Sequence, residues 1–189
     1  MKYTFSGWDK PIEVVVADKD YEYVAEFTES PQSYEAVFDA DGGVISGDSE
    51  VIYNKVEGLK MPVPVKTGYT FMGWRVVAND GRWTQTDLLT SSTYAGYWGN
   101  VSFKAEYVAT EYTIKLEASD GSTPEYKYTI ESTDKLPDLS NEGFVLVGWT
   151  VVSAEGNWIA GDNVAPDKLL TGMYGDVTLH PLGIAKLYK

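Results

Sequence analysis

The chain has 189 residues, of which 28 are acidic and 15 basic, and its net charge of −13 at pH 7 opposes binding to phosphate backbones, so we exclude nucleic acid as a partner. It has no cysteine, which excludes disulfides and thiolate chemistry, and no apolar run approaches the roughly 18 residues that span a bilayer, which excludes membrane insertion. The 14 Tyr, 6 Trp and 6 Phe favour a secreted, strand-rich protein, which we expect to be a monomer.

The sequence predicts strands almost throughout, because period-two alternation is common and the helical i, i+3, i+4 pattern never lasts. In chain order we expect strands at 3–8 and 21–27, then at 34–39, 51–54, 69–77 and 101–107, and then at 112–118, 126–130, 144–152 and from 177 onward. Turns are predicted at Gly42-Gly43 and Asp120-Gly121, and one helical turn each at 87–89 and 166–170. The expected fold class is mainly β with little helix.

A phrase that ends in Gly-Trp occurs three times and closes at Trp8, Trp74 and Trp149, which are 66 and 75 residues apart. The residues that follow Trp74 and Trp149 continue in register, whereas the first unit holds only the second half of the pattern. We therefore predict a truncated repeat at 1–30 and complete repeats at 31–109 and 110–189, cut from a longer array whose export signal lies outside this sequence. The three tryptophans are predicted to mark the cores, and Gly73 and Gly148 to permit a bulge or a close strand approach.

The residues FDADGG at 38–43, Pro62, GYTFMGW at 68–74 and FKAEY at 103–107 together resemble the Listeria/Bacteroides repeat family. This resemblance implies small β-grasp-like domains, repeated in tandem within large proteins of the bacterial cell surface, where they act as spacers or adhesive modules. The third unit departs from the pattern at Gly183, where family members usually end on an aromatic residue.

The sequence offers little chemistry. His180 is the only histidine and is expected to point outward from a strand, so we predict no catalytic residues and no enzyme activity. Asp39, Asp41 and Glu50 match three positions of a calcium-loop template, but Val44 stands where that loop requires glycine, so a carboxylate-decorated turn is the better interpretation. We predict no metal site and no cofactor.

Two functions remain open: a semi-rigid spacer that projects a distal domain, and a module that recognises a host glycan or host surface protein. The second rests on aromatic residues in the irregular segments, namely Trp83, Trp98, Trp158, Tyr94, Tyr97 and Tyr174. Trp83 and Trp158 are equivalent between the two repeats, which favours packing in the core. Trp98 has no tryptophan counterpart in the third unit and is the stronger candidate.

Overall fold

A computed structural model describes residues 1–12, 20–85, 87–90, 92–118 and 121–186. These residues form sixteen strands and no helix, which confirms the prediction of a mainly β protein. Both predicted helical turns are wrong, because short apolar stretches there join the sheets. β9 (Leu88–Leu89) pairs with β8 (Tyr69–Asn79), and Pro166 lies in a turn that leads to a bridge between Leu169 and Lys135.

The chain divides into two compact units. Unit 1 comprises Met1–Pro64 and Gly73–Glu106, and unit 2 comprises Val65–Met72 and Tyr107–Lys189. The boundary therefore passes through β8 and through β11 (Val101–Ala109). The repeat boundaries predicted at residues 30 and 109 stay predictions.

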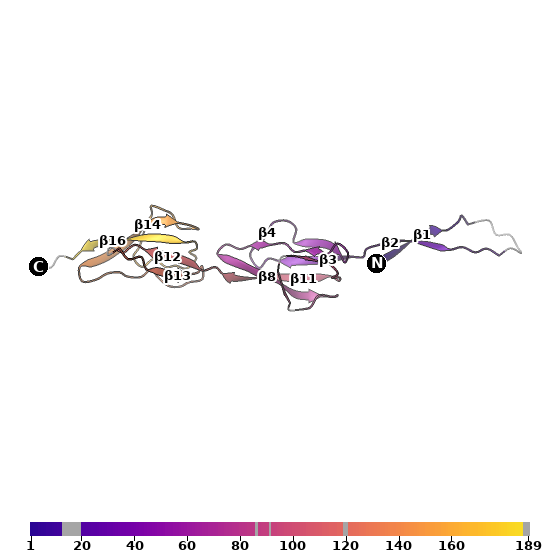
Figure 1. Cartoon of the computed structure of the whole chain (residues 1–189), viewed down its shortest axis with the longest axis horizontal. Helices are drawn as coiled ribbons and strands as arrows, with labels where there is room; N and C mark the ends of the chain where they lie inside the picture. The colour runs from indigo at the N-terminus through magenta and orange to yellow at the C-terminus, as the bar shows by residue number, and fades with distance from the viewer. Residues whose placement is uncertain (13–19, 86, 91, 119–120, 187–189) are drawn as a thin grey trace. The chain divides into compact units, whose positions relative to one another are not determined.

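Unit 1 contains a five-stranded sheet in which β3 (Ser33–Asp39) and β5 (Glu50–Asn54) join β8, β9 and β11 in the order β5-β3-β11-β8-β9. Figure 1 labels β3, β8 and β11 of this sheet. In sequence order β11 is the last strand of this sheet, yet it lies between β3 and β8, and it runs parallel to β3. Short strands pair elsewhere, β4 (Val44–Ile45) with β7 (Pro64–Val65) and β6 (Leu59–Lys60) with β10 (Thr93–Tyr94).

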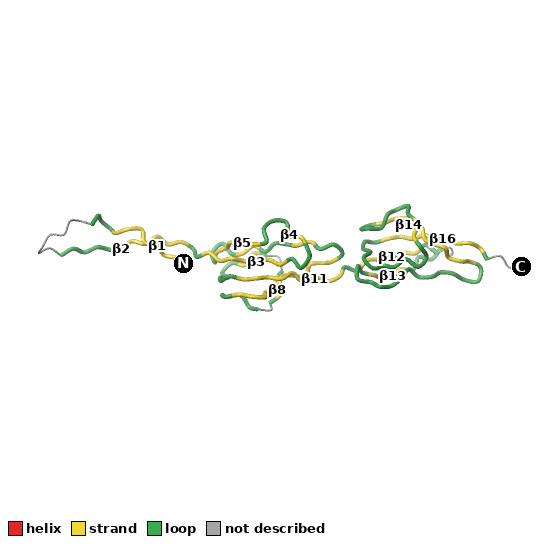
Figure 2. Tube along the Cα trace, turned by 180° about the vertical axis from the view of Figure 1, so that it is seen from behind, coloured by secondary structure: helices red, strands yellow, loops and turns green. Residues whose placement is uncertain are grey.

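Unit 2 contains a second five-stranded sheet with the same order (Figure 2). Its strands are β12 (Tyr112–Leu116), β13 (Glu125–Tyr128), β14 (Phe144–Ala154), β15 (Asn163–Val164) and β16 (Val177–Ala185), arranged β13-β12-β16-β14-β15. Again the last strand is central and parallel to the first. The repeat seen in the sequence is thus a repeat of sheet topology, whereas the finer β-grasp-like assignment stays a prediction.

Each sheet buries a hydrophobic face around the tryptophan of its repeated phrase. Trp74 and Trp149 are both 0% exposed. In unit 2 this core also holds apolar residues of β12, β14 and β16 and of the connecting segments: Ile114, Leu116, Tyr128, Leu136, Leu146, Val151, Trp158, Leu170, Val177 and Leu179. The period-two alternation places these side chains on one face of the pleated strands, which is why it predicted the strands well.

The N-terminal phrase forms a separate two-stranded sheet from β1 (Lys2–Trp8) and β2 (Ala25–Ser30). Trp8 is 45% exposed there, so the prediction that it marks a core is wrong for this tryptophan. The rings of Phe5 and Tyr23 pack against it, with centroid distances of 5.5 and 6.1 Å. Two strands alone cannot enclose a side chain of this size.

Two glycines of unit 2 lie where a larger residue would meet a neighbouring strand. The register of β14 against β16 shifts between Leu146 and Gly148, and a Cβ added at Gly148 would lie 2.9 Å from the carbonyl oxygen of Val164 in β15. At Gly183 an added Cβ would lie 1.9 Å from the ring of Phe144. The repeat therefore has no aromatic side chain at position 183, and the ring of Phe144 from the neighbouring strand occupies the space beside Gly183.

Candidate functional site

Trp83 lies in the core of unit 1 and is only 4% exposed. Its indole Nε1 donates a hydrogen bond of 2.7 Å to the Tyr53 hydroxyl, which in turn donates one of 2.5 Å to the carbonyl oxygen of Gly99. The chain of donors joins the irregular segment to β5 and to the start of β11. Because the indole is enclosed, its faces are not open to a ligand.

Unit 2 repeats this arrangement with Trp158, which is 6% exposed. Its Nε1 donates to the Tyr128 hydroxyl at 2.7 Å, and that hydroxyl donates to the carbonyl oxygen of Gly175 at 2.5 Å. Burial raises the pKa of Tyr128 to about 12, because the phenolate would lose its hydration. Trp83 and Trp158 thus both pack in a core, which is the role that their equivalent positions in the two repeats favour.

Tyr94 and Tyr97 surround Trp83 at the edge of the core. Their ring centroids lie 5.7 and 4.4 Å from that of Trp83, and both rings are half-buried. The Arg82 guanidinium lies 5.1 Å from the Tyr97 ring centroid and covers part of that ring. Only parts of these two tyrosines remain available for contact with a ligand.

Trp98 is the most accessible of the candidate aromatics that lie in the irregular segments, with 41% of its surface exposed. Its ring centroid lies 6.5 Å from that of Tyr34 in β3. Both rings line an open hollow of about 340 Å³ together with Asp80 and Asn100. We call this feature of unit 1, which Gln32, Ser33 and Gly99 also line, the Trp98 hollow.

The polar wall of the Trp98 hollow is held in place by hydrogen bonds. The Asp80 carboxylate accepts from the backbone N–H of Asn100 at 2.5 Å and from its Nδ2 at 2.9 Å. The Asn100 Oδ1 accepts from the backbone N–H of Glu35 at 3.0 Å. A partly exposed indole face beside a fixed carboxylate and amide suits a ligand that has an apolar face and hydroxyl or amide groups.

The counterpart of Trp98 in unit 2 is Tyr174, because each precedes the glycine that accepts the buried tyrosine hydroxyl. The Tyr174 ring lies 6.4 Å from that of Tyr112 and is half-buried. The Asp176 carboxylate accepts a 2.7 Å hydrogen bond from the backbone N–H of Thr113, as the Asn100 side chain does in unit 1. The scaffold is therefore shared, whereas the tryptophan belongs to unit 1.

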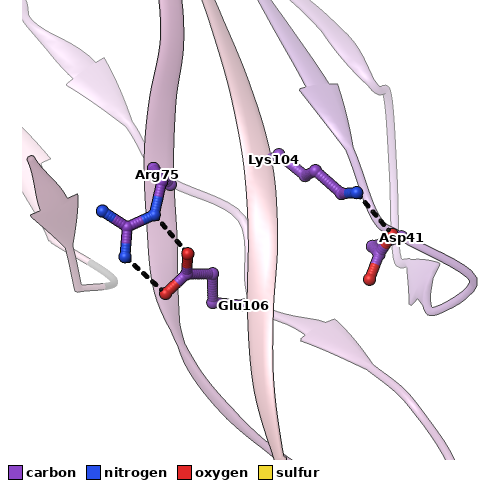
Figure 3. A network of polar contacts seen from close by, with 4 residues as sticks. All are labelled: Asp41, Arg75, Lys104 and Glu106. Carbon is purple, nitrogen blue, oxygen red and sulfur yellow. Dashed lines mark hydrogen bonds and ion pairs between the residues drawn. The ribbon is translucent and has the colours of Figure 1, made fainter. Parts of the chain in front are cut away.

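Ion pairs lie on the outer face of the sheet in unit 1 (Figure 3). Arg75 binds Glu106 through two guanidinium nitrogens, the Nη2–Oε2 contact being 2.7 Å, and Lys104 Nζ lies 2.9 Å from Asp41 Oδ1. The hydrogen bonds from Arg75 hold the pKa of Glu106 below its ordinary value, and those with Asp41 raise the pKa of Lys104. Such partly exposed pairs stabilise little and orient the strands' side chains.

Asp39 and His180, the metal and catalytic candidates, make local contacts in the structure. The Asp39 carboxylate accepts from the backbone N–H of Asp41 within the turn, at 2.9 Å. His180 is exposed, and its Nδ1 lies 3.4 Å from Glu117. Among the described residues, no group of three or more His, Cys, Asp or Glu side chains is placed to hold a metal ion, and no helix is long and apolar enough to cross a membrane.

Residues 34–97 match the model of the Listeria-Bacteroides repeat domain. This segment belongs to that family. The match covers β3 to β10 and thus includes Trp74, Trp83 and Tyr34, and it confirms the resemblance drawn from the sequence. Listeria-Bacteroides repeats occur as structural domains of bacterial surface proteins and are not known as enzymes.

The sequence singled out Trp98 but not the residues that complete its hollow. The sequence marks Tyr34 as the start of a strand, and no motif in it marks Asp80 or Asn100 as binding residues. A signal was present, because Tyr34 and Trp98 have aromatic counterparts, Tyr112 and Tyr174, at equivalent places in the next repeat. An aromatic pair that recurs at equivalent positions in two repeats indicates that its two members contact each other.

Proposed function

We propose that the chain is a spacer within an extracellular protein of a bacterial cell surface, where tandem repeats hold a distal domain away from the wall. The observation that carries this proposal is that both units build the same five-stranded sheet around the same fully buried tryptophan. Each repeat therefore has a core of its own, as modules of a tandem array require. Among the described residues, no buried side-chain nitrogen or oxygen lacks a hydrogen-bond partner.

A spacer also needs limited freedom at its links. Only Thr110 and Glu111 separate β11 from β12. The backbone N–H of Thr110 donates to the Gly68 carbonyl at 3.0 Å, and its hydroxyl lies 2.8 Å from that of Thr70. A connector of two residues between the predicted repeats is short, which supports the proposal of a semi-rigid spacer.

The test uses the absence of native cysteines. Val44 and Ile159, exposed by 71% and 64%, are replaced by cysteine, labelled with fluorophores, and the spread of their separation is measured by single-molecule energy transfer. We expect a narrow distribution that broadens when Gly-Ser-Gly-Ser is inserted after Thr110. The same insertion after Gly47, in an exposed turn, is the matched control. A native chain as broad as the Thr110 insertion would contradict the spacer.

The second candidate function is recognition of a host glycan or host surface protein through the Trp98 hollow. It is favoured by one observation, the exposure of Trp98 beside Tyr34 and a fixed carboxylate. We expect Trp98→Ala to weaken binding on a panel of glycans and host proteins by about tenfold, the effect of losing one central aromatic contact. Tyr174→Ala, the counterpart in unit 2, is the control and should leave binding unchanged. If Trp98→Ala binds as the native chain does, this candidate fails.

A further inference from the structure

The β1–β2 hairpin reproduces two strands of a complete repeat, residue for residue. Phe5 lies opposite Phe27, Gly7 opposite Glu26 and Trp8 opposite Ala25, with a register shift between Phe5 and Gly7. In unit 2 the strands β14 and β16 show the same sequence of pairs and the same shift: Leu146 with Gly183, Gly148 with Leu182 and Trp149 with Pro181. The hairpin thus corresponds to the third and fifth strands of a repeat.

In a complete repeat the first half of the unit covers the face that these two strands share. Ala36 and Phe38 of β3 lie beside Val101 and Phe103 of β11, and the Phe38 ring lies 4.9 Å from that of Trp74. The carbonyl oxygen of Pro62 accepts the Trp74 indole N–H at 2.7 Å. Both contacts come from residues 33–66, and they leave Trp74 fully buried.

The same face of the hairpin is exposed. Phe5 is 50% exposed, Trp8 45% and Phe27 57%, and their rings form a continuous aromatic face through Phe5. β2 begins at Ala25, the counterpart of Ala105, whereas β11 begins at Val101. Residues 21–24 are the counterparts of residues 101–104, which pair with β3, and they precede β2 instead of belonging to it.

We propose that this aromatic face is a docking surface for the first half of a repeat, an extended segment of the type of residues 33–66. Its first strand would run parallel to residues 21–24, with apolar side chains at alternate positions over Trp8, as Ala36 and Phe38 stand in β3. Strand addition of this kind supplies backbone hydrogen bonds along the edge and side-chain pockets on the face. A helical partner could fill the side-chain pockets but could not form the backbone hydrogen bonds along the edge, so an extended partner fits better.

The experiment adds a synthetic peptide with the sequence of residues 33–66 to the full chain and follows backbone amide exchange by mass spectrometry. We expect exchange to slow by about tenfold or more at residues 2–8 and 21–30 in a saturable way, because amides in a completed sheet open less often. Exchange at residues 144–185 serves as the internal reference and should not change.

Three comparisons make the result decisive. A peptide with Phe38→Glu, or a chain with Trp8→Ala, should bind about a hundredfold more weakly, because a large buried apolar group is lost. A chain with Ile159→Ala, which removes an apolar residue of 64% exposure in unit 2, should bind as before. The proposal is overturned if no protection appears, if protection appears at residues 101–104 because the peptide displaces β3, or if it grows with chain concentration alone, which would identify a second copy as the occupant.

Discussion

Truncation of the tryptophan in the repeated phrase should have very different effects in unit 2 and in the hairpin. Trp149→Ala removes a side chain that is 0% exposed, whereas Trp8→Ala removes one that is 45% exposed. The two residues occupy the same place in the same strand pair. They form a matched pair in which the position within the strand pair is the same and the burial of the side chain differs.

The cost of Trp149→Ala follows from its burial. A tryptophan removes up to about 250 Å² from water, and at about 25 cal/mol per Å² this gives about 6 kcal/mol, an upper bound because unfolded chains already bury some surface. Measured losses for Phe or Trp to Ala in cores are about 3–5 kcal/mol, which we take as the expected value. For Trp8, where about half the surface is covered, about 2 kcal/mol or less is expected, and only the hairpin should feel it.

Urea unfolding resolved by amide exchange separates the units, which need not unfold together. With a dependence of about 1.5 kcal/mol per M, Trp149→Ala should lower the midpoint of β12, β14 and β16 by about 2 M or more. The midpoint of β3 and β11 should stay unchanged. The reasoning is refuted if Trp149→Ala shifts unit 2 no more than Trp8→Ala shifts the hairpin.

Three further predictions concern single contacts. Burial raises the pKa of Tyr128 from the ordinary value of 10 to about 12. The hydroxyl therefore contributes its full stability to unit 2 below pH 10, and this contribution is lost as the pH rises through 12. In Tyr128→Phe the urea midpoint of unit 2 should vary less over this pH range. Gly73→Ala, where a Cβ would meet a backbone oxygen at 2.7 Å, should cost more stability than Gly183→Ala, where the ring of Phe144 can turn aside, and thermal denaturation of both variants measures the difference. Arg75→Gln should raise the pKa of the Glu106 carboxyl toward its ordinary value in an NMR titration, and an unchanged pKa would show that the pair does not hold in solution.

Strand positions could be predicted from the sequence because alternation of apolar and polar residues reports the pleat directly. The run 101–107 alternates without a break and forms β11, with Val101, Phe103 and Ala105 buried. The short apolar pair Leu88-Leu89 carries no period, so its helical assignment was wrong; it joins the edge of the sheet beside Trp74. Leu88-Leu89 forms a strand because it pairs with β8, and the local sequence carries no signal for that pairing.

The candidate site was predictable only in part. The exposure of Trp98 agrees with its lack of a tryptophan counterpart, but the Trp98 hollow depends on Tyr34, which lies 64 positions earlier in the sequence. The enclosure of Trp83 depends on the Tyr53 hydroxyl, a long-range partner that no local motif marks. Sequence equivalence between repeats identified the packing residues, whereas the shape of the surface needed the fold.

The parallel arrangement of the first and last strands has a consequence for a chain under tension. In unit 1, β3 and β11 run side by side in the same direction with Val101 opposite Ala36 and Lys104 opposite Asp39. A force applied through the two ends of the repeat pulls these neighbours past one another, so the hydrogen bonds between them are loaded together in shear rather than opened one after another. Forced unfolding is governed by the rate of unfolding, so for such a module the strength of this parallel strand pair matters more than the equilibrium stability of the whole unit.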